Sequence, residues 1–464
     1  EVRAPMERKA RVRTAAVALD EARAQVLEDF NLAVLERLRE CEALPTGTGT
    51  DDDSGDTGSS TGTDDTTTGP QPCLEDADCA SDSARPYCDP VQGMCAACDQ
   101  APDDATADAA CAALDPSVPL CVGGGCVACT SENTSVCDER LLICDEAAMA
   151  CVPCTEHEQC ESGVCDLLAE EPSCFDPDNA FDVGVNRRYL TITDALAAVE
   201  MMTLDRALLR LHGEGMMDHF TESVPIDFGV VAIIAADDDQ PRWSNSGDMA
   251  PPILSVTGTD TRVYLDGIRL SGSQSSVSPG ITCTGASIGI RRSRIVANTG
   301  GGIDATDGCV LDLQTSFVGG DANDVDAIYV EDSTLTMLYT TVGAGFGNAR
   351  ALTCNNPSSV TVRNSIMVSR DGGELDCSTA ISISNAANTS NGGKTTSVGV
   401  LNLNWFENYA TGNFLLSTSG GNNSGQQVFA DIATWQTGDP TTDIEGDPRP
   451  NSDGASDHPG ADVP

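Results

Sequence analysis

Sixteen of the 21 cysteines lie between positions 73 and 174, where their spacing is compatible with either metal or disulfide chemistry. They form four groups of four, numbered here as tetrads one to four. The members are Cys73, Cys79, Cys88 and Cys95; Cys98, Cys111, Cys121 and Cys126; Cys129, Cys137, Cys144 and Cys151; and Cys154, Cys160, Cys165 and Cys174. Two residues separate each tetrad from the next, so a CxxC pair marks every junction.

A CxxC pair that stands alone suggests zinc or redox chemistry. Here the spacing within the tetrads varies, and His157 is the one imidazole in this stretch that could serve as a nitrogen ligand. The stretch is rich in Gly, Asp and Pro, and it has too few apolar residues to form a stable hydrophobic core. An even number of cysteines in such a segment favours two disulfides in each tetrad, with the connectivity open. Oxidised cysteines place the chain outside the cytosol.

Arginines form the second set of residues that could take part in binding or catalysis, because five of them fall at related positions of a recurring segment. They are Arg269, Arg291, Arg292, Arg294 and Arg363. A guanidinium group donates paired hydrogen bonds to carboxylates and sulfates. Whether these side chains act together depends on the elements that carry them.

The recurring segment predicts a β-solenoid. Between residues 253 and 377, five stretches place apolar or small residues at their positions 1, 3, 6 and 8, with a period of roughly 24 residues. They begin at Val263, Ile288, Leu311, Leu335 and Val360. This pattern is strand alternation, then a two-residue outward bend, then a second strand.

A second series with a similar step predicts another strand in each period. It comprises Ile281, Ile303, Ile328, Leu352 and Leu375, which are followed two residues later by Cys283, Ala305, Val330, Cys354 and Cys377. Gly, Asn, Asp and Ser turn residues lie between the strands. Each period is therefore one coil of a solenoid whose inward columns stack into a continuous core.

These strands resemble a right-handed parallel β-helix of the pectin-lyase-like superfamily, in the broad group of secreted bacterial β-helix proteins. Residues 189–199 resemble the capping helix of that family, residues 207–234 its first turns, and residues 442–450 with 459–462 its closing segment. The resemblance implies the fold of about 178–464. It does not fix the function, because the superfamily includes lyases, hydrolases, adhesins and inert scaffolds. The cysteine tetrads resemble the small Cys-rich repeats of bacterial surface proteins, which are similar to Dickkopf-type modules.

The predicted fold class is mainly β: a right-handed parallel β-helix solenoid over 177–464, preceded by a disulfide-rich module over 73–176. Residues 45–72, rich in Thr, Gly and Asp, predict a disordered acidic linker that resembles the stalk of surface proteins. Residues 1–44 predict a helix with an apolar stripe, for which a short coiled coil is one interpretation. Cys41, near its end, is a candidate for lipid attachment or, alternatively, a thiol able to form a dimer.

The charge balance excludes several partners. The chain has 72 acidic and 25 basic residues, for a net charge of −47. This balance argues against binding to nucleic acid or to an anionic membrane surface. No stretch is apolar over the length that a membrane span requires. The acidic balance is compatible with Ca²⁺ association, but no specific motif indicates it, and we expect no cofactor.

Alignment of the repeats places Arg269 and Arg294 in one outward column on successive turns, about 4.8 Å apart. Arg291, Arg292 and Arg363 fall in the neighbouring bend columns. Stacked like charges are unfavourable without partners.

Two interpretations of these arginines remain open. In one, acids such as Asp266 and Asp312 neutralise them. In the other, they form an anion-recognition strip for a uronic-acid glycan or a sulfate. Phe317 and Tyr339, in nearby outward columns, would then offer sugar-stacking faces, or would simply cover the side of the solenoid.

Catalysis is the competing hypothesis. By the resemblance, lyases of the superfamily use Ca²⁺-binding aspartates with an arginine base, and its hydrolases use clustered aspartates with a Gly-His-Gly signature. None of the four histidines has such a context, and the nearest acidic motif, with Asp304 and Asp307, is explained equally well by turns. A groove that holds three convergent carboxylates, or two with an arginine, would favour an enzyme.

We therefore expect an exported, cell-surface protein with a non-catalytic role in adhesion, envelope display or glycan recognition. Its partner would be a polysaccharide or another surface protein. The alternative is a polysaccharide lyase or glycoside hydrolase that acts on an acidic glycan.

Cysteines inside the solenoid test the register. Cys354 and Cys377 share one inward column on successive turns, so their Cα atoms should lie about 4.8 Å apart, within disulfide range. Stacked free thiols are the alternative. Cys283 and Cys309 also lie on adjacent turns but are offset along the repeat, so their pairing requires a turn to bring them together.

Overall fold

The computed structural model describes residues 72–80, 84–213, 219–236, 239–245, 247, 249–320, 322–371, 373–377, 381–383, 385–388 and 395–464. The helix expected over 1–44, most of the linker expected over 45–72, and Cys41 lie outside the described residues. Among the described residues, no helix is both long and apolar enough to cross a membrane.

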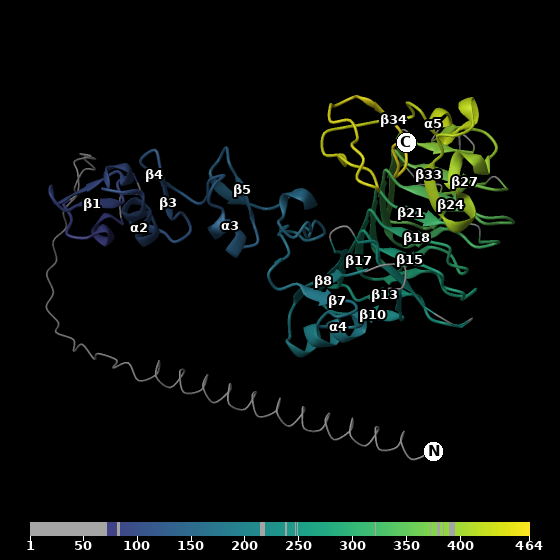
Figure 1. Ribbon diagram of the computed structural model, residues 1–464, viewed down its shortest axis with the longest axis horizontal. Helices are drawn as coiled ribbons and strands as arrows, with labels where there is room; N and C mark the ends of the chain where they lie inside the picture. Colours follow the sequence, from purple (N-terminus) through teal and green to yellow (C-terminus); the bar gives the residue numbers. More distant parts are fainter. Residues whose placement is uncertain are drawn as a thin grey trace, which may run out of the picture. The chain divides into compact units, whose positions relative to one another are not determined.

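The Cys-rich module consists of small disulfide-bonded units (Figure 1). Antiparallel hairpins join β1 (Tyr87–Asp89) to β2 (Met94–Ala96), β3 (Leu120–Val122) to β4 (Gly125–Val127), and β5 (Ile143–Asp145) to β6 (Ala150–Val152). The helices are η1 (Asp76–Cys79), η2 (Cys98–Gln100), α2 (Asp104–Leu114), α3 (Ser135–Glu139) and η3 (His157–Gln159). In each hairpin, the third and fourth cysteines of a tetrad lie opposite each other.

Every tetrad has the same disulfide connectivity, first to third and second to fourth cysteine. The pairs are Cys73–Cys88, Cys79–Cys95, Cys98–Cys121, Cys111–Cys126, Cys129–Cys144, Cys137–Cys151, Cys154–Cys165 and Cys160–Cys174. Their Cα atoms lie 5.2 to 6.1 Å apart. Each closed loop of about 15 residues contributes roughly 3 kcal/mol by restricting the unfolded chain. The predicted disulfides thus replace a core, and their sulfur atoms are not available to a metal.

Residues 181–387 form a parallel β-solenoid of about eight turns. Sheet one contains β7 (Phe181–Val183), β8 (Arg206–Leu211), β11 (Val230–Ala235), β14 (Arg262–Asp266), β17 (Ser287–Arg291), β20 (Val310–Gln314), β23 (Thr334–Leu338), β26 (Ser359–Arg363) and β29 (Ile381–Ile383). Sheet two contains β9 (His219–Thr221), β12 (Arg242–Ser244), β15 (Arg269–Ser271), β18 (Arg294–Val296), β21 (Phe317–Gly319), β24 (Thr341–Ala344), β27 (Ile366–Ser369), β30 (Ala386–Ala387) and β31 (Thr396–Ser397). Sheet three contains β10 (Val224–Ile226), β13 (Leu254–Thr257), β16 (Ile281–Thr284), β19 (Ile303–Thr306), β22 (Ile328–Glu331), β25 (Leu352–Asn355) and β28 (Leu375–Asp376).

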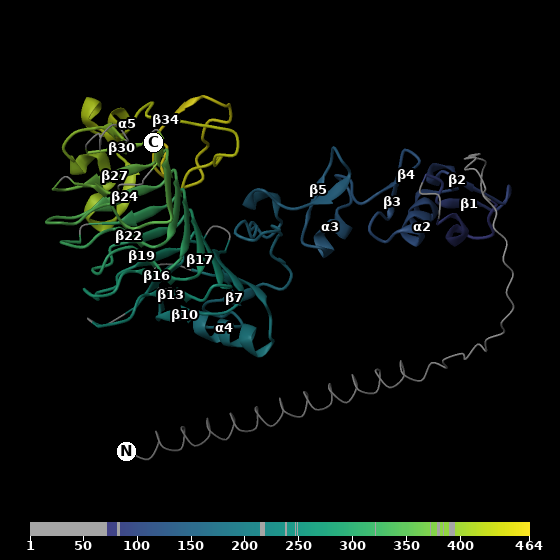
Figure 2. The same cartoon turned by 180° about the vertical axis from the view of Figure 1, so that it is seen from behind.

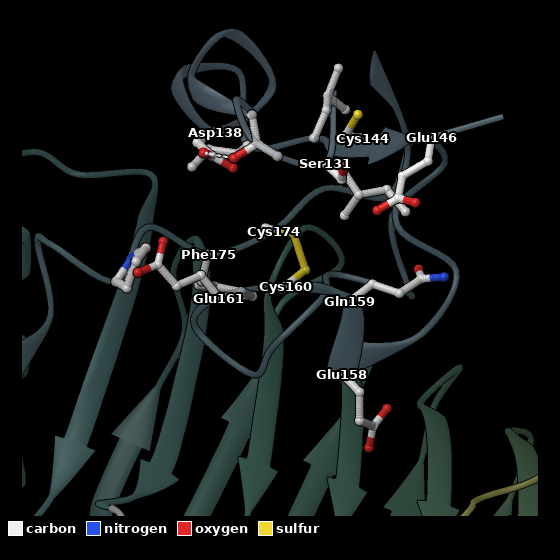
Figure 3. A pocket seen from close by; sticks show the side chains of 15 residues that line it. Ser131, Asp138, Cys144, Glu146, Glu158, Gln159, Cys160, Glu161, Cys174 and Phe175 are labelled. Carbon is white, nitrogen blue, oxygen red and sulfur yellow. Dashed lines mark hydrogen bonds between the residues drawn. A yellow bond between two sulfur atoms is a disulfide. The ribbon is translucent and has the colours of Figure 1, made fainter. Parts of the chain in front are cut away.

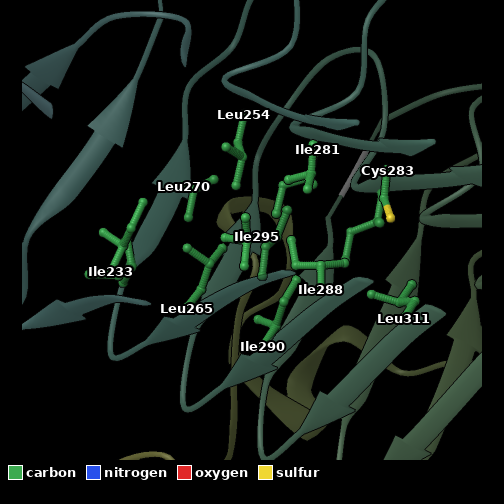
Figure 4. Close-up of a cluster of buried hydrophobic side chains, with 14 of the residues drawn as sticks. Ile233, Leu254, Leu265, Leu270, Ile281, Cys283, Ile288, Ile290, Ile295 and Leu311 are labelled. Carbon is green, nitrogen blue, oxygen red and sulfur yellow. The ribbon is translucent and has the colours of Figure 1, made fainter. Parts of the chain in front are cut away.

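The core lies between the three sheets and follows the predicted columns. Ile288, Ile290 and Ile295 come from one repeat, and each is at most 1% exposed. Figure 4 shows these side chains stacked with their counterparts from adjacent turns. The helix α4 (Ile192–Met201), predicted as a cap, begins at Thr191, whose side chain accepts a hydrogen bond from the Asp194 N–H.

Two disulfides join successive turns of the solenoid. Cys354 and Cys377 are bonded, with Cα atoms 4.8 Å apart, as their shared column predicted. Cys283 and Cys309 are bonded as well, at 5.8 Å, because the turn at Asp307 and Gly308 folds Cys309 back over the strand that precedes it.

Buried hydroxyl groups line the corner between sheets one and two. Ser293, Ser316, Thr340 and Ser365 occupy the second position of successive two-residue bends and are 0% exposed. Ser293 Oγ donates to the Arg291 carbonyl and accepts from the Ile268 N–H of the preceding turn. The same pair of bonds recurs at Ser316 and Ser365. The bend N–H groups of Ile268, Ser293 and Thr340 therefore each have a hydroxyl partner on the next turn.

Residues 398–464 do not continue the repeat but cover the outward side of sheet two (Figures 1 and 2). They include η5 (Leu403–Trp405), β32 (Phe406–Asn408), η6 (Tyr409–Thr411), β33 (Asn413–Leu416), η7 (Gly421–Asn423), α5 (Gly425–Val428), β34 (Ala433–Thr434) and β35 (Ser456–Asp457). The Gly460 N–H donates to the Asn364 carbonyl, and the Ala461 N–H donates to Thr341 Oγ1. The segment expected to close the solenoid therefore runs along its side.

A buried carboxylate attaches tetrad four to sheet one. Asp166, 0% exposed, accepts hydrogen bonds from Arg206, Arg262 and the Tyr264 hydroxyl at 2.5 to 3.0 Å. Burial raises the pKa of Asp166, but these three donors outweigh that effect and hold the pKa below its usual value. The buried carboxylate is thus fully paired, with two guanidinium groups and a hydroxyl.

We predict that Asp166→Asn loosens tetrad four, because removal of one partner of a buried ion pair costs about 3 kcal/mol. The measurement is hydrogen exchange at the Phe175 amide, which donates to the Val164 carbonyl. Its protection should fall roughly a hundredfold, whereas Asp178→Asn, at an exposed carboxyl nearby, should leave it unchanged. Since the folded pKa of Asp166 is lowered, its stabilisation is present above the unfolded pKa and is lost as the pH falls through the folded one. Unchanged protection in Asp166→Asn would contradict this account.

Candidate anion-binding site

Three arginines lie in one outward column of sheet two. Arg242 of β12 is the register partner of Arg269 of β15, and Arg269 is the partner of Arg294 of β18. In-register parallel strands place such residues about 4.8 Å apart. The column contains the predicted pair Arg269 and Arg294, extended by one turn.

Their surroundings differ along the column. Arg242 lies against Gly272, where a Cβ atom would come within 2.7 Å of its Nη2, so the glycine leaves room for the guanidinium group. Arg242 Nε is buried and has no hydrogen-bond partner among the described residues. Arg269 Nε donates to Ser271 Oγ at 3.2 Å. Arg294 pairs with Glu445 at 3.4 Å and lies 5.5 Å from the Phe317 ring.

The column is therefore unevenly neutralised. In the described part of the chain, no carboxylate forms an ion pair with Arg242 or Arg269. Burial lowers the pKa of Arg269, and repulsion by Arg242 and then Arg294 lowers it further. Burial also lowers the pKa of Arg294, against the opposing effect of Glu445. An anion that bridges Arg242 and Arg269 would relieve this repulsion.

A groove of about 400 Å³ adjoins the column. Arg292 and Arg294 line it, together with three carboxylates, Asp239, Asp266 and Glu445. The other walls come from Ser162 and Gly163 of tetrad four, from residues 234–236, Gln240 and Gly267 of the solenoid, and from Ile444 and Gly446. The groove thus receives groups from the solenoid, from the Cys-rich module and from the C-terminal segment.

The other predicted arginines serve the structure. Arg291 is buried, and its guanidinium group pairs with Asp266 at 2.6 Å and with Glu158 of tetrad four. Arg292 donates two hydrogen bonds to Asp266, at 2.7 and 2.8 Å. The two arginines keep the pKa of Asp266 below its usual value although burial raises it. Asp266 thus neutralises the bend arginines, as one interpretation predicted.

Asp312 does not take part in this neutralisation. Burial raises its pKa to about 6, and it pairs with no group in the described residues. Arg363 is engaged by Asp439 of the C-terminal segment at 2.8 Å, so it does not belong to an open strip either.

The aromatic faces predicted for sugar stacking are not accessible. Phe317 and Tyr339 do point away from the core between the sheets, but both are 0% exposed. Phe414 packs edge-on against Phe317, and Trp435 and Ala433 pack on Tyr339. The prediction was wrong because the C-terminal segment, which has no repeat, covers this side.

The alignment of the repeats did not identify Arg242 as a member of the column. Residues 236–241 separate β11 from β12, whereas two residues separate the corresponding strands of later turns. A usable signal was present, because Trp243 follows Arg242 as an inward residue just as Leu270 follows Arg269.

A second set of polar groups lies on the outward face of sheet three. Asp304, Tyr329, Thr353 and Asp376 are register partners on successive turns. Asp326 accepts a hydrogen bond from the Arg350 N–H at 2.9 Å, and the Arg350 side chain pairs with Asp376. On this face the carboxylates of Asp304 and Asp326 interact, and Arg350 lies beside Asp326. No three carboxylates among the described residues lie within 4.8 Å of one another.

Three groups of cysteines lie close enough together to resemble metal sites, but all of their sulfur atoms are in disulfides. The three such groups, in tetrads one, two and four, contain bonded sulfur atoms. His157 is also occupied, since its Nδ1 accepts a hydrogen bond from the Cys165 N–H. Burial, followed by the nearby Arg291 charge, lowers the pKa of His157 to about 4, so the imidazole is neutral.

The fold defines a parallel β-solenoid protein with a disulfide-rich N-terminal module. Comparison with known proteins finds that residues 59–180 match a family of unknown function, DUF8331. That match covers the Cys-rich module and the residues just before it. No curated protein and no solved structure matches the chain.

We predict that Asp304 titrates near pH 6. Burial, and then the like charge of Asp326, raise its pKa to about 6. Carboxyl-carbon NMR should show Asp326→Asn lowering this pKa while leaving it above the usual value, because burial remains. Asp332→Asn, at an exposed turn carboxyl, serves as the control. Since the folded pKa is raised, the contribution of Asp304 to stability is present below its unfolded pKa and is lost as the pH rises through 6. A pKa indifferent to Asp326→Asn would refute the coupling.

Proposed function

We propose that this is an exported surface protein that recognises an acidic glycan, without modifying it, through Arg242, Arg269 and Arg294. The observation that carries the proposal is the three-arginine column itself, two of whose members have no acidic partner in the described residues. Such recognition would serve adhesion or envelope display.

Net charge supports a local rather than a global attraction. At −47, the chain as a whole repels polyanions, so a ligand is held only where arginines are concentrated, as at Arg242 and Arg269, which form no ion pair in the described residues. A linear polymer that carries a carboxylate or sulfate on successive units can lie along the column and meet one guanidinium group per turn. A single small anion would meet fewer of them.

The groups around the column support binding rather than reaction. Arg242 contacts Gly272 and Arg269 contacts Ser271, and neither neighbour is a ready proton donor or acceptor near neutral pH. The ten disulfides support an extracellular location, because the cytosol would reduce them.

We predict that the protein binds sulfated or uronate oligosaccharides on a glycan array and that added salt weakens this binding. In calorimetry with the best ligand, Arg242→Gln with Arg269→Gln should reduce affinity at least tenfold, because each charge-assisted hydrogen bond is worth about 1.5 to 3 kcal/mol. Arg188→Gln, an exposed arginine near the capping helix, is the matched control. Equal binding by the double variant, or a preference for neutral glycans, would exclude the column as the site.

The second candidate function is cleavage of an acidic glycan at the outward face of sheet three. The observation in its favour is the pair Asp304 and Asp326 beside Arg350, in which the raised pKa of Asp304 suits a group that donates a proton near pH 6. Reducing-sugar and unsaturated-uronide assays on polyuronates test it. Product formation that disappears in Asp304→Asn would establish an enzyme, whereas binding without product in both proteins would leave recognition as the function.

A further inference from the structure

A second cleft lies within the Cys-rich module, and neither Arg242, Arg269 nor Arg294 lines it. It has a volume of about 540 Å³ and opens between tetrads three and four. Ser131, Asp138 and Glu146 lie on one side of it, and Gln159 and Glu161 lie on the other (Figure 3). Clefts of this size accommodate several side chains of a ligand.

The walls of this cleft are fixed before any ligand arrives. Disulfides close both tetrads, and the Cys174 N–H of tetrad four donates to the Leu141 carbonyl of tetrad three at 2.7 Å. Leu141 and Ile143 pack against the cysteines of tetrad four. Leu141 holds a φ of 57°, a left-handed conformation that is costly for a bulky residue and that persists only where the surroundings enforce it. A preorganised cleft binds with little loss of conformational freedom.

The lining combines carboxylates with apolar side chains. Asp138, Glu146, Glu158 and Glu161 are acidic, and no Lys, Arg or His lines the cleft. Glu158 is the one of the four that pairs with an arginine, Arg291.

Apolar surface is contributed by Leu141, Leu142, Ile143 and Pro177, all partly exposed, beside the buried Phe175. Leu141 and Ile143 also pack against the cysteines of tetrad four, so Leu142 and Pro177 are the partly exposed apolar residues considered as contacts for a ligand.

A metal ion does not suit this arrangement. Carboxylates that bind a cation converge on one point, whereas no three acidic groups in the described residues come within 4.8 Å of one another. The acids instead lie on opposite sides of the cleft, with Asp138 and Glu146 on one side and Glu161 on the other (Figure 3). A ligand that satisfies both must be extended, with cationic groups at its edges and apolar groups between them.

We propose that the cleft between tetrads three and four binds a basic segment of a partner protein in which Arg or Lys alternates with apolar residues. The cationic side chains pair with Asp138, Glu146 and Glu161, and the apolar side chains pack on Leu142 and Pro177. This site takes a protein ligand of positive charge, so it is chemically opposite to the arginine column and independent of it.

The test uses the full chain and a fluorescein-labelled peptide of four Arg-Leu repeats, followed by fluorescence anisotropy. Peptides of four Arg-Ser and four Glu-Leu repeats separate the charge contribution from the apolar one. The Arg-Leu peptide should bind at least tenfold more tightly than the Arg-Ser peptide, because burial of a Leu side chain contributes about 1.5 to 3 kcal/mol. The Glu-Leu peptide should not bind.

Three variants locate the site. Asp138→Asn with Glu146→Gln and Glu161→Gln should weaken Arg-Leu binding at least tenfold, and Leu142→Ser should reduce it toward the Arg-Ser value. Glu170→Gln with Glu171→Gln removes two exposed charges of tetrad four that do not line the cleft, and it should have little effect. Comparable weakening by the control pair would show general attraction to an acidic protein and overturn the proposal. Equal affinity for the Arg-Leu and Arg-Ser peptides would overturn it as well.

The Arg242→Gln and Arg269→Gln variant keeps the two proposals distinguishable. Since these arginines do not line the cleft, their loss should leave Arg-Leu binding unchanged whether or not the protein recognises an acidic glycan. Loss of peptide binding in this variant would place the peptide elsewhere and contradict the assignment.

Discussion

The buried hydroxyl ladder at the corner between sheets one and two fixes the register on which the other features depend. Ser293, Ser316 and Ser365 each pair a bend N–H of the preceding turn with a carbonyl of their own turn. A slip by one residue would break these bonds and would also exchange inward with outward side chains along every strand. Such a slip would bury the column Arg242, Arg269 and Arg294.

The same corner decides which arginines serve the structure. Arg291 precedes the bend, and Arg292 is its first residue. Both pair with Asp266, and Arg291 also pairs with Glu158 of tetrad four. Arg269 begins the next strand, directly after the bend, and its register neighbours on the turns before and after it are the arginines Arg242 and Arg294. Arginines that differ by two or three positions along the repeat therefore have different surroundings. Arg291 joins the solenoid to tetrad four, whereas Arg269 has no acidic partner in the described residues.

Much of the fold was accessible from the sequence because a solenoid is nearly one-dimensional. The inward columns and the proximity of Cys354 to Cys377 follow from the period and the alternation, whereas the capping helix was predicted from the family resemblance. Position 6 of the repeat was predicted as small and inward, but the pattern does not reveal that its serines form a ladder. The tetrads allow three pairings each, and only the structure distinguishes first-to-third with second-to-fourth from the others.

Apart from Arg242, the missed features discussed next have a different physical origin, because each depends on contacts across more than 60 residues of chain. Phe317 is buried by Phe414, and Arg363 is neutralised by Asp439, from a segment without any repeat. Asp166 reaches Tyr264 from a module that the sequence treats as separate.

These contacts also change the interpretation of the Cys-rich module. Glu158 lines the cleft of tetrads three and four and at the same time pairs with Arg291, which shares Asp266 with Arg292 at the groove beside the arginine column. One chain of buried and half-buried ion pairs therefore runs between the two candidate sites. Because Asp166 and Arg291 secure tetrad four independently, neutralisation of one site by a ligand need not release the other. Under the two proposals above, the surface would therefore hold a cationic and an anionic partner at once rather than exchange them.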